Sequence, residues 1–108
     1  MKKEPQGEGD CYEVHANLMI ELKNDEYTLC HGNAIGQGPI SGIEHGHCWI
    51  EYRDLVLDIS NGKAVTYLKS DYYLKGHINP EKVKRYTWKE MAHHMIETEH
   101  YGPWDDDE

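Results

Sequence analysis

Three residues of this chain have the types and the order that nucleophilic catalysis requires. Cys11 lies where a helix is expected to begin, His47 lies on one expected strand, and Asp58 lies on the next. A thiol can attack a carbonyl carbon, an imidazole can carry its proton, and a carboxylate can hold the imidazole in the required tautomer. The sequence therefore predicts a catalytic triad of Cys11, His47 and Asp58.

The strand register predicts that two of these side chains meet. We expect Arg53-Asp54 to form a two-residue turn, which pairs Trp49 with Asp58. His47 lies two residues before Trp49 and therefore on the same face of the sheet. His47 and Asp58 are then diagonal neighbours, roughly 5–8 Å apart at Cβ. An imidazole and a carboxylate at this separation can form a hydrogen bond.

The expected place of Cys11, at a helix N-terminus with access to solvent, favours a reactive thiolate. The positive end of a helix dipole and the unpaired N–H groups of a first turn lower a thiol pKa from its ordinary value of ~8.5. The same N–H groups can hold an oxyanion, so acyl chemistry on amides, esters or thioesters is expected. Cys30 and Cys48 lie within expected strands and are predicted to be core residues. His15, one turn after Cys11, is expected to point along the surface.

The elements that position these residues follow from hydrophobic spacing and turn signals. A helix is predicted from about residue 11 to 23, with Asp10 as its N-cap and Glu13 as the capping partner. A last helix is predicted after a second capping pair, Thr87 and Glu90. Between the two helices the sequence predicts strands over 27–31, 45–52, 55–60, 64–68 and 83–86, and a short helix over 70–75.

These elements describe one α+β domain over residues 10–104. An N-terminal helix packs on an antiparallel sheet, and a C-terminal helix ends at Gly102-Pro103. Residues 1–9 are expected to be a flexible lead-in, and residues 105–108 an acidic tail. The glycine-rich stretch between residues 32 and 46 is expected to be a mobile loop or an irregular hairpin, because its spacing matches no phosphate-binding motif.

The two central strands resemble the histidine and aspartate strands of papain-like and transglutaminase-like cysteine enzymes. They read Gly46-His47-Cys48-Trp49-Ile50-Glu51 and Val56-Leu57-Asp58-Ile59-Ser60. In these families the nucleophilic cysteine opens a helix that packs on the same sheet. The resemblance covers residues 11–62 and implies a small papain-like fold, with Cys11 as nucleophile, His47 as general base and Asp58 as the orienting residue. It implies a hydrolase or acyltransferase that acts on a peptide, a protein or a small amide.

Composition excludes several classes of partner. The chain has 108 residues, 11 of them basic and 20 acidic, and its net charge is −9. Such a surface is repelled by phosphate backbones and anionic lipid, so we expect neither nucleic acid nor a membrane as partner. No apolar run approaches the ~20 residues of a membrane span. Three cysteines without a C-x-x-C pair fit free thiols in a reducing cytoplasm, and no cofactor is expected.

Two alternatives use the same residues differently. His45, His47 and Glu51 match the first metal motif of cupins, and strand alternation puts the three on one face. This alternative predicts a cupin-like metal-binding protein, whereas the triad needs no metal. The other alternative is a non-catalytic protein-binding module, such as an inhibitor of a larger enzyme, that uses its acidic face and exposed tyrosines.

Overall fold

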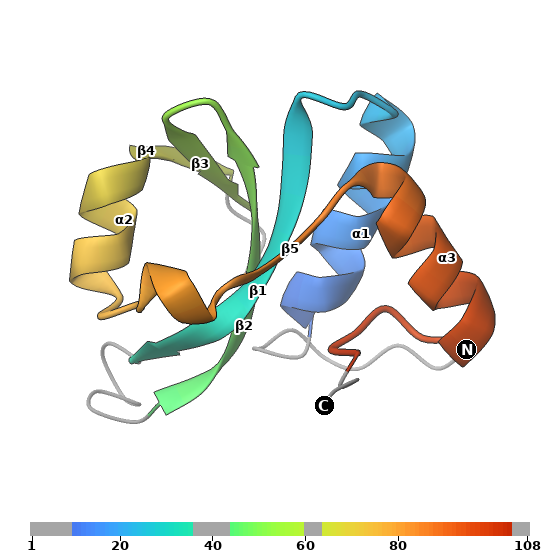
Figure 1. The fold of residues 1–108 in the computed structure, drawn as a ribbon. Helices are drawn as coiled ribbons and strands as arrows, with labels where there is room; N and C mark the ends of the chain where they lie inside the picture. The colour runs from blue at the N-terminus through green and yellow to red at the C-terminus, as the bar shows by residue number, and fades with distance from the viewer. Residues whose placement is uncertain (1–9, 36–43, 60–63, 105–108) are drawn as a thin grey trace.

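A computed structural model describes residues 10–35, 44–59 and 64–104 (Figure 1). The elements are α1 (Asp10–Leu22), β1 (Tyr27–Ile35), β2 (Glu44–Tyr52), β3 (Leu55–Asp58), β4 (Val65–Leu68), α2 (Lys69–Lys75), the 3-10 turn η3 (Pro80–Lys82), β5 (Lys84–Tyr86) and α3 (Trp88–Thr98). Three predicted features lie outside the described residues: the lead-in over 1–9, the central part of the glycine-rich stretch and the acidic tail over 105–108.

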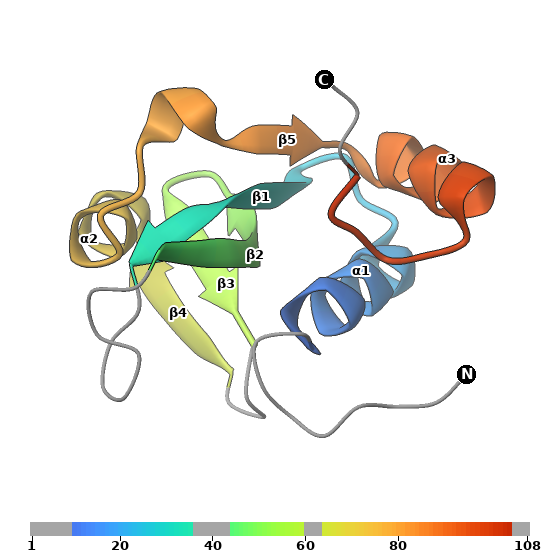
Figure 2. The same cartoon turned by 90° about the horizontal axis from the view of Figure 1, so that it is seen from below.

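The strands form one antiparallel sheet in the order β4-β3-β2-β1-β5. Strands β1 to β4 follow one another as a meander, and β5 returns to pair with β1. Helices α1 and α3 cover one face of the sheet, and α2 lies against the other (Figures 1 and 2). The predicted α+β class, with a helix before and a helix after an antiparallel sheet, is confirmed.

The alternation of side chains along β2 supplies two separate cores. Cys48 and Ile50 point toward α1 and α3, where they join a cluster of buried side chains that includes Met19, Leu29 and Met91. The intervening side chains point toward α2. That second cluster is made of Cys30, Ala34, Trp49, Val56, Tyr72, Tyr73 and Ile78. A single strand therefore anchors both layers of the domain.

Strand β1 is longer than predicted. It pairs with β2 from Tyr27, opposite Tyr52, to Ile35, opposite Glu44, whereas the sequence indicated an end at residue 31. The reason is tertiary pairing, which overrides the weak strand propensity of glycine. Gly32 is required where it lies, because a Cβ there would come within 2.9 Å of the Trp49 ring.

Both terminal helices differ from the prediction, α1 at its start and α3 at its end. Helix α1 begins at Asp10 itself, whose side chain lies outside the described part of the chain. Helix α3 has the predicted capping box, in which Thr87 accepts from the Glu90 N–H and Glu90 accepts from the Thr87 N–H. The predicted end at Gly102-Pro103 is wrong: the helix ends at Thr98, because Glu99 adopts a left-handed conformation with φ of 62°.

Candidate functional site

The predicted contact between histidine and aspartate is present at the end of β3. Strand β2 pairs with β3 through a two-residue turn, with Tyr52 opposite Leu55 and Ile50 opposite Leu57. This register brings His47 Nε2 to 3.3 Å from Asp58 Oδ2. Both side chains are largely buried, with exposed fractions of 17% and 16%. The pair is therefore partly shielded from water, which strengthens its electrostatic interaction.

Tyr72 is a third member of this group, and it comes from α2, which lies against the same face of the sheet as the His47 side chain. Its hydroxyl donates a hydrogen bond of 2.8 Å to Asp58 Oδ2, the same oxygen that faces His47. Burial raises the pKa of Tyr72, and the charge and hydrogen bond of Asp58 raise it further, so the hydroxyl stays protonated and remains a donor. Sequence reasoning missed this residue, because a seven-residue helix carries no signal of which strand end it faces.

His15 contradicts the prediction that it lies along the surface. It is fully buried, and its Nδ1 lies 2.7 Å from the carbonyl oxygen of Cys11. Its Nε2 accepts the N–H of Ile59 at 3.0 Å, so Nδ1 must carry the proton and donate to Cys11. Burial lowers the pKa of His15, which keeps the ring neutral. With both ring nitrogens engaged, His15 joins the first turn of α1 to the end of β3 and is no rival base.

Cys11 lies in the first turn of α1, as predicted, but the expected solvent access is wrong. Its side chain has no exposed surface and packs in the same cluster as Cys48. One observation relates its backbone to the aspartate: the carbonyl of Cys11 binds His15, whose Nε2 lies 4.0 Å from Asp58 Oδ1. The sulfur packs with Cys48 on the α1 side of the sheet, whereas the His47 ring lies with Trp49 and Tyr72 on the α2 side. The meeting of the thiol with His47 therefore stays a prediction.

The other two cysteines are core residues, as predicted. Cys30 and Cys48 are fully buried, on opposite faces of the sheet, and neither forms a disulfide. Burial raises the pKa of both thiols above the ordinary range. Neither thiol is a nucleophile at neutral pH, since the thiolate is the reactive form.

Glu51 belongs to a separate buried network. Its carboxylate accepts hydrogen bonds from Trp49 Nε1 at 3.1 Å and from the Tyr73 hydroxyl. It also forms ion pairs with Arg85 at 3.3 Å and with Lys69 at 3.4 Å. Burial acts to raise the pKa of Glu51, but the two hydrogen bonds and the two cations outweigh it and lower the pKa. The carboxylate is therefore charged and joins β2 to β5 and α2.

This network bears on the cupin alternative. The ligand set would need Glu51, which two cations already occupy, and His45, whose side chain lies outside the described residues. Within residues 10–35, 44–59 and 64–104, no group of three or more histidine, cysteine, aspartate or glutamate side chains could hold a metal ion. The sequence spacing could not reveal that Arg85 and Lys69 pair with Glu51, and the cupin alternative stays a prediction.

Comparisons of the chain with protein-family models, with curated proteins and with solved structures give no match. The papain-like and transglutaminase-like resemblance is therefore a hypothesis that rests on the residues of the two central strands and on Cys11. In the described part of the chain, every helix is too short or too polar to cross a membrane.

Proposed function

We propose that this protein is a thiol-dependent hydrolase or acyltransferase that acts on an amide or peptide bond. Cys11 is the nucleophile, His47 the general base and Asp58 the residue that orients the base. The observation that carries the proposal is the 3.3 Å contact between His47 and Asp58, beside the strand end that His15 joins to the first turn of α1. The substrate is a peptide, a protein or a small amide.

The proposed reaction uses the two nitrogens of His47 for different purposes. Nε2–H donates to Asp58, so the lone pair on Nδ1 takes the proton of the Cys11 thiol. The thiolate forms a bond to the carbonyl carbon, and the tetrahedral oxyanion is held by N–H groups of the first turn of α1. The imidazolium then gives its proton to the leaving amine as the C–N bond breaks, and a thioester remains.

The second half of the reaction repeats these proton transfers. Water or an amine attacks the thioester carbonyl and gives a proton to His47 Nδ1. The C–S bond breaks, and the proton returns to the sulfur of Cys11 with release of an acid or a new amide. Tyr72 and His15 are positioning residues in this scheme, because Tyr72 holds the carboxylate of Asp58 and His15 holds the helix start.

The test is selective alkylation of the native protein with iodoacetamide at neutral pH, read by peptide mass spectrometry. All three cysteine side chains are buried, but only Cys11 lies at a helix N-terminus, which favours the reactive thiolate. We therefore expect Cys11 to react about tenfold faster than Cys30 and Cys48. The His47→Ala variant should slow the Cys11 reaction by a similar factor, and His93→Ala, an exposed histidine on α3, serves as its matched control.

Alkylation in denaturant provides the reference rate, because all three thiols are then equally accessible. Equal native labelling of the cysteines, labelling of Cys11 only in denaturant, or an unchanged Cys11 rate in His47→Ala would each contradict the nucleophile. We also propose a cytoplasmic location, because the three cysteines are free thiols and a reducing compartment preserves them.

A further inference from the structure

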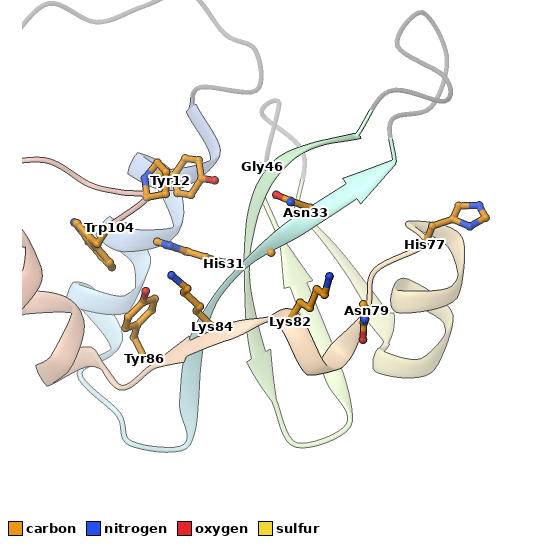
Figure 3. Close-up of a pocket in the computed structure, with 12 residues that line it drawn as sticks. Tyr12, His31, Asn33, Gly46, His77, Asn79, Lys82, Lys84, Tyr86 and Trp104 are labelled. Carbon is orange, nitrogen blue, oxygen red and sulfur yellow. The ribbon is translucent and has the colours of Figure 1, made fainter. Parts of the chain in front are cut away.

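A pocket of about 480 Å³ lies along β1, between residues of β2 and β5 (Figure 3). It is formed by residues of α1, β1, β2, η3 and β5 and by the segment that follows α3. Tyr12 and Gly46 line it, and these are the chain neighbours of Cys11 and His47. None of Cys11, His47 and Asp58 is among the described residues that line the pocket, so we treat it as a site separate from the candidate triad.

His31 is the feature of this pocket that points to a ligand. Its side chain is only 5% exposed, and within the described residues neither ring nitrogen has a hydrogen-bond partner. Burial lowers the pKa of His31 to about 3, so the ring is neutral at physiological pH, with one nitrogen donating and the other accepting. A buried polar group without a partner costs free energy, and native proteins rarely retain one. A ligand atom in the pocket would supply the partner.

The charge of the pocket indicates what kind of ligand it takes. Lys82 and Lys84 line it, and no aspartate or glutamate is among the described lining residues. Lys84 pairs with His31 across β1 and β5 and therefore shares its face of the sheet. The chain as a whole has a net charge of −9, whereas the described lining of this pocket contributes two ammonium groups and no carboxylate, which favours an anion.

Aromatic rings form the remaining wall. Trp104, Tyr86 and Tyr12 lie with their ring centroids 5.0, 5.1 and 4.9 Å from that of His31. Figure 3 shows these rings gathered around His31 at one end of the pocket, with Lys84 beside them and Lys82 farther along, near Asn79. Such a wall favours a planar or apolar group, because ring stacking adds to the burial of apolar surface.

We infer that this pocket binds a small organic anion, in which a carboxylate or phosphate faces the ammonium groups of Lys82 and Lys84 and an apolar group packs against Trp104 and Tyr86. A polar atom of the same ligand forms a hydrogen bond with the ring of His31. The inference is independent of acyl transfer, because binding in this pocket needs no reaction at Cys11.

The experiment is an NMR titration of the full chain with three probes: phenylacetate, phenyl phosphate and the neutral phenylacetamide. The signals followed are the His31 ring Cε1–H and the Trp104 indole N–H. We expect phenylacetate, phenyl phosphate or both to shift these signals with a dissociation constant on the order of 1 mM, as suits so small a ligand. The relative affinity of the two anions distinguishes a carboxylate site from a phosphate site. Phenylacetamide should bind about tenfold more weakly.

Two variants test the assigned residues. Lys82→Met/Lys84→Met should weaken anion binding about tenfold or more, whereas Lys23→Met/Lys89→Met, which removes the same charge outside the pocket, should not. His31→Phe should weaken binding but leave the empty protein at least as stable, because it removes the polar group that lacks a partner. No binding of either anion, equal binding of phenylacetamide, or unchanged affinity in the lysine or His31 variant would overturn the inference.

Discussion

Replacement of His15 by leucine is expected to destabilise the protein by about 2–4 kcal/mol. Leucine fills a similar volume but removes two hydrogen bonds, to the Cys11 carbonyl at 2.7 Å and from the Ile59 N–H at 3.0 Å. The bond from Nδ1 to the Cys11 carbonyl is buried, so its loss costs about 1–3 kcal/mol even though that carbonyl keeps its helical N–H partner. The Ile59 bond is only partly buried, so water can replace it and the cost is about 1 kcal/mol.

Two further variants separate these contributions. The amide nitrogen of asparagine lies where Nδ1 lies in histidine, so His15→Asn keeps a donor for Cys11 and loses the acceptor for Ile59. The side-chain oxygen of glutamine reaches the position of Nε2, so His15→Gln keeps the acceptor and loses the donor. We expect glutamine to be the more destabilising of the two, because the Cys11 carbonyl is the more buried partner.

Urea unfolding followed by tryptophan fluorescence measures these differences, with His93→Leu as the exposed control. The iodoacetamide rate at Cys11 gives a second reading, because release of the helix start moves the thiol away from Asp58. A His15→Leu variant as stable as the control, or one that loses stability with no change in the Cys11 rate, would refute the argument that His15 joins the two elements.

Three other expectations follow from single contacts. The pKa of Glu51 is lower in the folded protein than in the unfolded chain, where it is ~4.3, so the charged carboxylate stabilises the fold. This stabilisation is fully present above pH ~4.3 and is lost as the pH falls through the folded pKa. Urea unfolding from pH 7 to 3 should show the loss in the native protein and not in Glu51→Gln. Tyr72→Phe removes the hydrogen-bond donor to Asp58 and should slow alkylation of Cys11 several-fold, with a loss of about 1 kcal/mol in stability. An unchanged alkylation rate would show that the hydroxyl has no positioning role. Gly102→Ala should cost about 1–3 kcal/mol by thermal unfolding, because the φ of Gly102 is +122° and a Cβ would come within 2.7 Å of His31; a neutral effect would mean that the segment relaxes.

The sequence predicted the contact between His47 and Asp58 because that contact depends on local information. A two-residue turn sets the register, and strand alternation sets the face. His15 was predicted wrongly because helical spacing says which residues share a side of α1 but not how far the end of β3 reaches along it. The role of His31 was missed for a similar reason, since its partners Tyr86 and Trp104 lie more than fifty residues away in the chain.

The ion pairs of the buried Glu51 carboxylate could not be predicted from the sequence pattern either. The sequence pattern put it on the correct face of β2, together with His47 and Trp49. Its partners Arg85 and Lys69 come from β5 and α2, and their approach is decided only when those elements pack. Pattern reasoning therefore found which face a residue lies on, and packing determined what the residue does there.

The order of the strands has a consequence for how the two sites assemble. The candidate triad needs only α1, the β1 to β4 meander and α2, whose strand pairings are between chain neighbours. The pocket around His31 needs β5, which must cross back to β1 to pair. Contacts between distant segments form late and open first in local unfolding. Amide hydrogen exchange should therefore reveal two cooperative units, in which β5 and α3 open while β2 and β3 stay paired. The proposed ligand binding and the proposed acyl chemistry can thus vary independently within one small domain.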